Sequence, residues 1–364
     1  IVSSPVLSHS KFAQLKQIDL PGYGFEVIDL NYAESEGLQA AIQRICAQAE
    51  AAVRAGRSQL VLSDRAIQPG FLPISALMAT GAVHHHLMNA GWRCDANIIV
   101  ETGFARDPHH FAVLIGFGAS AVYPYLAYDI IADMARNGEI LGDPLEAQGY
   151  FRKGIDKGLL KIMSKMGIST IASYRGAQLF EAVGLDSVVV ETCFKGVPSR
   201  IQGANFADIE GDQRLLADDA WKARKSLDQG GLLKFVYGKE YHAFNPDVIN
   251  TLHTAVRSGD YADYQAYADL VNTRPVATIR DLLKLKVADQ PLAIDAVEPL
   301  TAILKRFDSA GMSLGALSPE AHESIAIAMN TLGGRSNSGE GGEDPVRYGT
   351  IKNSKIKQVA SGRF

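Results

Sequence analysis

The sequence SQLVLSD at residues 58–64 is a short apolar run with polar residues at its ends, and ANIIVET at 96–102 repeats the pattern. A helical pattern over residues 74–90 separates the two runs. Apolar strands that alternate with helices indicate βαβ units and a mostly parallel sheet. Because the strands are almost continuously apolar, we expect helices on both faces of this sheet. The predicted fold class is therefore α/β.

The same alternation extends in both directions along the chain. Further strands are predicted at 24–30, 121–129 and 186–192, and further helices at 34–55, 107–117, 150–166 and 174–183. Pro124 counts against the strand at 121–129, since proline cannot donate to a ladder. Charged helical stretches dominate from about 195 to 290, and the α/β rhythm restarts over 295–334. We place a domain boundary near residue 290, which gives domains 1–290 and 291–364.

The composition indicates a soluble globular protein with a large core: 47% of residues are hydrophobic, 21% are charged and the net charge is −4. Lys and Arg are dispersed, which argues against nucleic acid and anionic membranes as partners. No apolar run reaches the ~20 residues of a membrane helix. The N-terminus lacks the pattern of a signal peptide, and cytoplasmic localisation is predicted. Ile1 in place of Met suggests a piece of a longer chain.

Metal sites are not predicted. Cys46, Cys94 and Cys193 are far apart, with no CxxC spacing. The triplet at residues 84–86 consists of histidines, but consecutive helix residues project about 100° apart and cannot all face one ion. The pair at residues 109–110 follows Asp107-Pro108 and is expected to begin a helix.

Two further motifs have a structural and a functional interpretation. Residues 116–121 match GxGxxA, but a helix precedes the motif where a dinucleotide site needs a strand, so we expect its glycines to end that helix. Polar residues follow two strands, at 63–65 and 101–102, where α/β proteins place sites or buried ion pairs. We predict a structural charge network there, made of Asp64, Arg65, Glu101, Arg106 and Asp107.

Residues 311–349 have the strongest site character. A strand is predicted at 312–317, and a helix begins at the cap Ser318 and ends at Gly333-Gly334. Its predicted buried face consists of Ala321, Ile325, Ala328, Met329 and Leu332. The loop 336–344 follows, rich in glycine and carrying three acids. It is either a solvated linker or an active-site loop after a βα unit. The basic residues beyond it, which are either surface cations or anion ligands, are Lys352, Lys355, Lys357 and Arg363.

Long stretches of this sequence resemble the large subunit of glutamate synthase. They are GMSLGALSPEAHESIAIAMNTLGGRSNSGEGGEDPVRYG (311–349), SKIKQVASGRF (354–364), CDANIIVETGFARDPHHFAVLIGFGASAVYPYLAYD (94–129), KIMSKMGISTIASYRGAQLFEAVGL (161–185) and QGGLLKFVYGKEYHAFNPDVI (229–249). The resemblance implies that residues 1–290 form the central α/β domain and residues 291–364 the first βα units of the (β/α)8 FMN-binding domain. Within this resemblance, the sequence KMGISTIASYRGAQLFEAVGL (165–185) favours the NADPH-dependent bacterial type over the ferredoxin type.

The resemblance also implies an activity, cofactors and partners. The full enzyme would make two L-glutamates from L-glutamine and 2-oxoglutarate. Ammonia freed by an amidotransferase domain would travel through a tunnel, which the central domain helps to form, to a site with FMN. A 3Fe–4S cluster would relay electrons. The partners would be the remaining amidotransferase and FMN domains and an electron donor, either an NADPH-type subunit or ferredoxin.

The site residues implied by the resemblance lie in the 311–349 region. Ser313, Gly315 and Ala316 are expected to lie under the flavin, and Glu340 and Glu343 are the candidate catalytic acids. Four loop residues, Ser336, Asn337, Ser338 and Gly339, are expected to border the substrate or the tunnel. Because no complete catalytic constellation is present, we expect this chain alone to lack tight FMN binding and activity. The alternatives are a free-standing α/β flavoenzyme and a non-catalytic interaction module.

Overall fold

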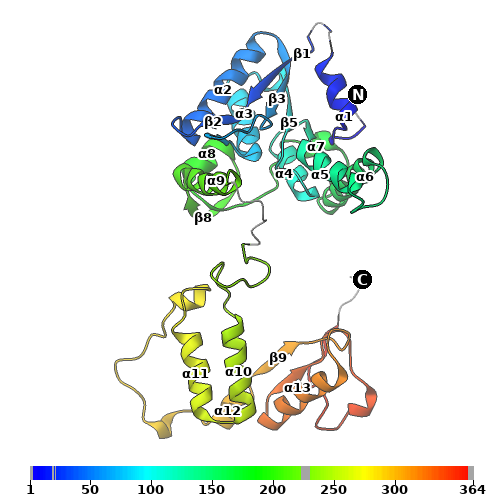
Figure 1. The fold of residues 1–364 in the computed structure, drawn as a ribbon. Helices are drawn as coiled ribbons and strands as arrows, with labels where there is room; N and C mark the ends of the chain where they lie inside the picture. The colour runs from blue at the N-terminus through cyan, green and yellow to red at the C-terminus, as the bar shows by residue number, and fades with distance from the viewer. Residues whose placement is uncertain (1–2, 19, 21, 223–229, 360–364) are drawn as a thin grey trace. The chain divides into compact units, whose positions relative to one another are not determined.

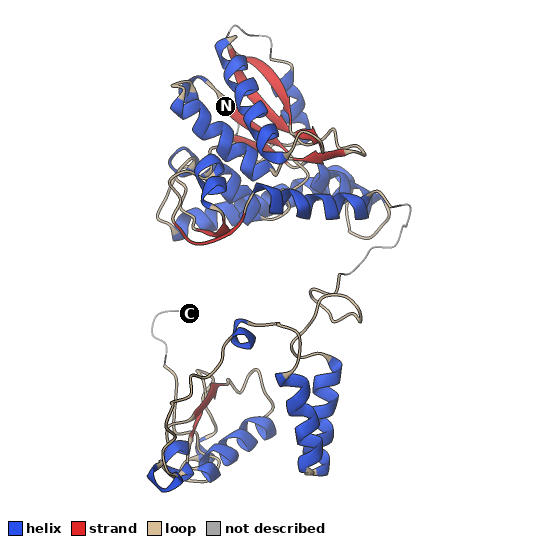
Figure 2. Cartoon of the chain, turned by 90° about the vertical axis from the view of Figure 1, so that its left-hand side faces the viewer, coloured by secondary structure: helices blue, strands red, loops and turns tan. Residues whose placement is uncertain are grey.

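The computed structural model describes residues 3–18, 20, 22–222 and 230–359, which divide into two compact units, Ile1–Ser226 and Leu227–Phe364. The two units are drawn in Figure 1 and, by secondary structure, in Figure 2. None of the helices in the described part of the chain combines the length and hydropathy that crossing a membrane requires. The predicted division at residue 290 concerns sequence domains and stays a prediction.

A four-stranded parallel sheet forms the centre of the first unit, in the order β1-β3-β5-β6. The strands are β1 (Gly24–Asp29), β3 (Arg57–Ser63), β5 (Asn97–Glu101) and β6 (Ala121–Tyr123). The helices of the βαβ connections are α2 (Leu38–Arg54), α3 (Ala76–Asn89) and α4 (Pro108–Gly116), with the one-turn η1 (Arg93–Asp95) before β5. The predicted parallel α/β sheet is confirmed.

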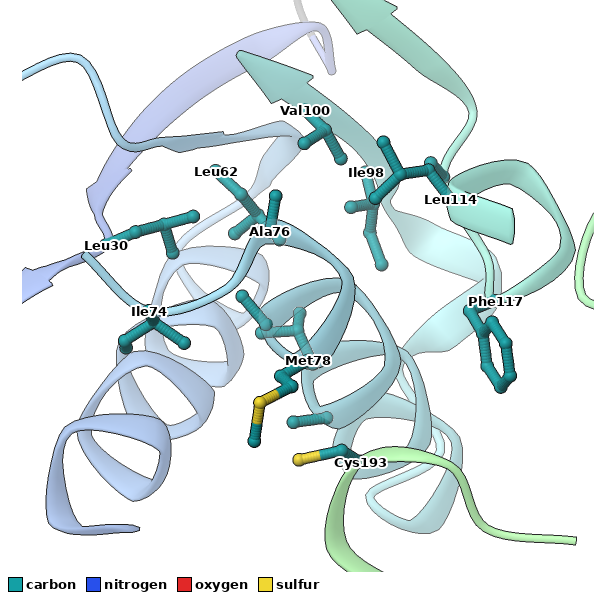
Figure 3. Packing of buried hydrophobic residues seen from close by; sticks show 14 of the residues in the cluster. Leu30, Leu62, Ile74, Ala76, Met78, Ile98, Val100, Leu114, Phe117 and Cys193 are labelled. Carbon is teal, nitrogen blue, oxygen red and sulfur yellow. The ribbon is translucent and has the colours of Figure 1, made fainter. Parts of the chain in front are cut away.

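Both faces of this sheet are covered, as its apolar strands predict. On β3, Leu60 and Leu62 join the larger core with α2, α3 and α4. Figure 3 shows Leu62 in this core, with Ala76 of α3 and Leu114 of α4. Between them, Val61 points to the opposite face and packs with residues of α1 (His9–Lys16) and α5 (Tyr125–Arg136). Alternate residues of a strand face opposite sides, so this one strand contributes to both cores.

Smaller elements complete the first unit. They are the antiparallel pair β2 (Asn31–Ala33) and β4 (Phe71–Pro73), the parallel pair β7 (Ala182–Leu185) and β8 (Ser199–Ala204), and the helices α6 (Pro144–Lys165), α7 (Ile171–Tyr174), α8 (Ser187–Cys193) and α9 (Phe206–Ala220).

Three predicted elements of the first unit are wrong in whole or in part. The strand predicted at 186–192 is helix α8, because Asp186 caps it by accepting from the amide of Val188 and three of its side chains pack into the core. The strand predicted at 121–129 ends at Tyr123, and α5 follows Pro124 directly. The helix predicted at 174–183 is a loop that leads into β7. Capping and tertiary packing override β-propensity at residues 186–192.

The second unit begins with a helical hairpin, α10 (Pro246–Ser258) and α11 (Tyr261–Asn272). Gly259, with φ +67°, ends α10, and the side chain of Asp260 caps α11. One-turn helices follow: η2 (Ile279–Leu282), η3 (Ile294–Ala296) and α12 (Leu300–Leu304). The unit then forms the βα segment β9 (Asp308–Gly311), α13 (Pro319–Leu332), β10 (Arg335–Asn337) and η4 (Pro345–Arg347).

The βα segment differs from the prediction in the position of its first strand. Residues 312–317, predicted as a strand, form a turn, and the strand β9 lies just before them. Its residues have low β-propensity, but β9 pairs in parallel with β10 and Arg335 contacts Asp308 at 2.7 Å across the ladder. Backbone pairing with β10 and this ion pair therefore favour a strand at residues 308–311, although the β-propensity of these residues does not.

Helix α13 begins and ends as predicted but buries a different face. Ser318 accepts a hydrogen bond from the amide of Ala321, and Gly333 ends the helix at φ +81°. The fully buried side chains are His322 and Ala326. The predicted face was wrong for its three exposed members, Ala321, Ala328 and Leu332. The helix is rotated so that a polar residue, His322, faces inward.

Candidate functional site

The two segments predicted to form the site meet in the second unit. A Cβ atom added to Gly339 would lie 3.0 Å from the hydroxyl oxygen of Ser313, and one added to Gly341 would lie 3.1 Å from the amide of Leu314. Gly339 also has φ +61°, a conformation that favours glycine. The glycines of the loop therefore let it lie directly against the turn after β9.

Backbone hydrogen bonds fix the start of the loop. The carbonyl of Asn337 accepts from the amide of Met312 at 3.3 Å, and its side-chain oxygen accepts from the amide of Gly339 at 3.0 Å. Ser336 and Ser338 bond through their backbones to Ile356, each at 3.0 Å. Both serine side chains are buried, and the Ser336 hydroxyl has no hydrogen-bond partner among the residues that the structure describes. Three chain segments, β9, β10 and the strand-like bridge at Ile356, thus lie parallel side by side.

Glu343 is a buried carboxylate held by two cations. Its oxygens lie 3.2 Å from Nη2 of Arg347 and 2.6 Å from Nζ of Lys357, and its side chain is 0% exposed. The amide of Ser354 donates to both oxygens, at 3.1 and 3.0 Å. Burial raises the pKa of Glu343, but the hydrogen bonds from Lys357 and Ser354 outweigh burial and hold it below its ordinary value. The geometry suits a carboxylate that stays ionised and anchors the end of the loop.

Glu340 has the opposite environment. Its side chain is exposed, and in the described part of the chain no hydrogen bond or ion pair holds it. Gly315 and Ala316 are exposed as well, and a Cβ atom added to Gly315 would meet no atom of the described residues within 4 Å, its chain neighbours aside. The free surface of the site thus carries Glu340, Gly315 and Ala316, while Glu343 lies beneath it.

The basic residues after the loop mostly have protein partners. Lys352 contacts Glu323 at 2.7 Å, Lys355 donates to the carbonyl of Gly334 at 3.3 Å, and Lys357 binds Glu343. Arg363 lies outside the described residues. The surface-cation interpretation therefore fits the three lysines better than a role as anion ligands.

His322 was not predicted as a site residue from the sequence. It contacts both the turn after β9 and Arg347, which follows the loop. Its Nε2 lies 3.0 Å from the carbonyl oxygen of Met312, and its Nδ1 lies 2.8 Å from Nη1 of Arg347. The side chain is 3% exposed. The one available signal was its spacing of four residues before Ala326, which places both on one helix face.

The charge network at the strand ends is smaller than predicted. Arg65 lies 3.7 Å from Glu101 and 3.7 Å from Asp129. The hydroxyl of Thr102 donates to Asp64, and the amide of Gly103 does so at 3.0 Å. Burial raises the pKa of Asp64. The inclusion of two predicted members was wrong: Asp107 caps α4, and the amide of Arg106 bonds to His110.

The side chains of the histidine triplet point to three different partners. His84 accepts from Nε of Arg93 at 2.8 Å, His85 contacts Gln178 at 2.7 Å, and His86 contacts Glu50 at 2.7 Å.

The GxGxxA motif at residues 116–121 has a packing role. Gly118 has φ +116° just beyond α4, and a Cβ atom added to Gly116 would lie 2.5 Å from the ring of Phe180.

Two family models match the chain. The model described as "Glutamate synthase central domain" matches residues 1–186, and the one described as "Conserved region in glutamate synthase" matches residues 242–364. The chain belongs to the glutamate synthase family. The family resemblance that the sequence predicted is thereby confirmed.

Relatives in this family match along almost the whole chain. The NADPH glutamate synthase large chain of Bacillus subtilis is 42% identical and that of Azospirillum brasilense 43%; the matches cover 99% and 100% of the chain. Ferredoxin-dependent glutamate synthase 1 of Arabidopsis thaliana is 41% identical over 100% of the chain. The chain spans 24–25% of the length of these relatives. Among solved structures, a flavocytochrome b2 with sulfite bound is 17% identical, with a TM-score of 0.31 over 62% of this chain and 46% of its own.

Proposed function

We propose that this chain is part of an enzyme that makes two L-glutamates from L-glutamine and 2-oxoglutarate. The observation that carries the proposal is the match of both units to glutamate synthase, at 42% identity along 99% of the chain. Because the chain spans about a quarter of those relatives, the activity belongs to the larger protein. The remaining amidotransferase and FMN domains would be its partners.

Within this enzyme, residues 1–290 would form the central domain, which links the amidotransferase and FMN sites and helps to form the ammonia tunnel. Residues 291–364 would begin the (β/α)8 FMN domain. The parallel arrangement of β9, α13 and β10, with a further parallel bridge at Ile356, supports this because a barrel starts with such units.

FMN fits the turn after β9. Gly315 and Ala316 are exposed, and a Cβ atom at Gly315 would meet no atom of the described residues within 4 Å, its chain neighbours aside. Ser313, Gly315 and Ala316 would therefore lie against the flavin ring. When bound, FMN would supply the hydride that reduces an imine to glutamate. The role of this chain's turn is to let the backbone approach the ring closely and to exclude water from that side.

The iron–sulfur cluster does not fit the cysteines of this chain. Cys46 and Cys193 are buried, and burial raises the pKa of Cys46 to about 12, which disfavours the thiolate that a cluster needs. Cys94 is exposed. A 3Fe–4S cluster would therefore be held by other parts of the enzyme.

The loop would border the site of 2-oxoglutarate and ammonia through Ser336, Asn337, Ser338 and Gly339. The two candidate acids, Glu340 and Glu343, would have different roles. Exposed Glu340 is free to hold an ammonium ion or accept a proton, and a positioned acid or base typically contributes 10²–10⁴-fold. Buried Glu343 already has two cationic partners and would hold the loop in place.

We propose an NADPH-type electron donor and a cytoplasmic localisation, following the sequence of residues 165–185 and the bacterial relatives. The two donors are distinguished by measuring whether NADPH or reduced ferredoxin reduces the flavin of the intact enzyme.

The test of the site is a pair of variants in the intact enzyme, Glu340→Gln and Glu343→Gln. Glutamine-dependent and ammonia-dependent glutamate formation are measured at fixed FMN content. We expect Glu340→Gln to lower activity at least tenfold with unchanged unfolding, and Glu343→Gln to lower stability as well. Wild-type rates for both variants in both assays would contradict the functional role of the loop.

A further inference from the structure

The two hydrogen-bond partners of His322 determine which tautomer its ring adopts. The guanidinium of Arg347 is always a donor, so Nδ1 of His322 must accept the hydrogen bond at 2.8 Å. The ring's remaining proton then sits on Nε2 and is donated to the carbonyl oxygen of Met312 at 3.0 Å. The histidine thus links Arg347 to the backbone at the start of the turn.

Arg347 is itself fixed on its other sides. Its Nε and Nη2 donate to the carbonyl of Lys352 at 3.0 and 2.7 Å, and Nη2 lies 3.2 Å from Glu343. Glu343 is fixed in turn by Lys357 and by the amide of Ser354. A continuous series of buried polar contacts therefore runs from the end of the loop to Met312.

The Met312 carbonyl is directly followed by Ser313, and Ser313 is where the loop approaches the turn. The amide nitrogen of Ser313 lies 3.1 Å from the position of a Cβ at Gly339. A small rotation of the Met312–Ser313 peptide would therefore close or open the contact between turn and loop. We infer that His322 is a positioning residue that sets the turn 312–316 against the loop 339–341, through its hydrogen bond to Met312.

Any effect of His322 on catalysis rests on the proposed function, in which the turn faces the flavin. In the structure itself it rests on contacts among the described residues. In the intact enzyme, the positioning role of His322 can be tested separately from the proposed function. Amide hydrogen exchange reports the position of the turn whether or not flavin binds there.

The experiment compares His322→Gln with His322→Asn in the intact enzyme. A glutamine amide nitrogen reaches the place of Nε2 and keeps the donor to Met312, whereas an asparagine oxygen reaches the place of Nδ1 and keeps only the contact to Arg347. Hydrogen exchange is followed in a peptide spanning residues 308–317, with a peptide from β5 as the control for the global fold.

We expect exchange in 308–317 to be roughly tenfold faster in His322→Asn, as for the loss of one hydrogen bond to a partly buried carbonyl, and near wild type in His322→Gln. If both variants exchange alike, the inference is overturned. Should the asparagine variant not accumulate, Arg347→Lys replaces it. One ammonium cannot keep both His322 and the Lys352 carbonyl, so the same acceleration is expected, and unchanged exchange contradicts the inference.

The FMN affinity and the ratio of kcat to KM for 2-oxoglutarate are measured on the same proteins. Faster exchange in His322→Asn together with FMN binding at least threefold weaker supports both the inference and the proposed function. Faster exchange with unchanged FMN affinity and kinetics supports the positioning role of His322 and contradicts the placement of the turn at the flavin.

Discussion

The carboxylate of Glu210 accepts a hydrogen bond from the backbone amide of Leu38 at 2.6 Å, across 172 positions of sequence. Leu38 is the first residue of α2, and the preceding residue, Gly37, has no side chain to cap the helix. An amide at a helix N-terminus needs such a partner. Helix α9 thus supplies the cap that α2 lacks.

We predict that Glu210→Ala lowers the free energy of unfolding by about 1–2 kcal/mol, because α2 loses its cap. Glu34→Ala is the control. Glu210 also pairs with Arg214, at 2.6 Å. Glu34 contacts the same arginine, at 3.1 Å, but it is partly exposed, and its loss is expected to cost no more than about 0.5 kcal/mol. Denaturant unfolding measures both. Equal losses in the two variants would show that the Arg214 pair, and not the cap, is what matters.

A second prediction concerns the pH dependence of stability. Burial, with Arg93 nearby, lowers the pKa of His84 from 6.5 to about 4. The folded protein therefore keeps this ring neutral between pH 6.5 and 4, whereas the unfolded chain takes up a proton. Stability should fall as the pH drops through this window, by on the order of 2 kcal/mol after allowance for solvent screening.

The variant that tests this is His84→Asn. Its side-chain oxygen can still accept from Nε of Arg93 but does not titrate. Free energies of unfolding measured from pH 7 to pH 4 should decline less steeply than in the wild type. The same decline in both proteins would rule out His84 as the group responsible.

The third prediction compares two glycines of α6. A Cβ atom at Gly154 meets nothing within 4 Å, whereas one at Gly158 would lie 2.4 Å from Pro108 of α4. We expect Gly154→Ala to stabilise the protein by about 0.5–1 kcal/mol and Gly158→Ala to destabilise it by about 1–3 kcal/mol. Thermal unfolding of the two variants checks this. A shift in the same direction for both would mean that α4 and α6 do not approach as closely as described.

Much of the first unit could be predicted because local signals and packing agree there. The strands around Leu60 and Ile98 are apolar and lie between polar ends, and Asp107-Pro108 begins a helix in the way its sequence indicates. At residues 188–190 the three valines favour a strand, but the cap at Asp186 and the burial of the helix face decide otherwise. Capping of this kind competes with propensity and is hard to weigh from sequence alone.

The candidate site could be located from sequence only as a region. The sequence indicated the glycine-rich loop and the capped helix, but it predicted a strand at residues 312–317, where the structure has a turn that lies against the loop. The division between exposed Glu340 and buried Glu343 depends on Lys357, and the role of His322 depends on Arg347, which is 25 positions away. Side-chain partners at such separations follow from the tertiary fold, so single-sequence patterns did not reveal them.

The central claim is that the turn after β9 faces FMN in a glutamate synthase, and Gly315→Ala tests it most directly. Apart from its chain neighbours, the added methyl group meets no atom of the described residues within 4 Å, so the variant should fold normally. Gly211→Ala is the control, because its methyl group also enters open space but lies on α9 in the first unit.

The measurement is the titration of FMN into the flavin-free intact enzyme. We predict that Gly315→Ala weakens FMN binding by at least tenfold, about 1.4 kcal/mol, because the methyl group occupies space that the ring needs. The control variant should bind like the wild type. Wild-type FMN affinity in Gly315→Ala would contradict the claim.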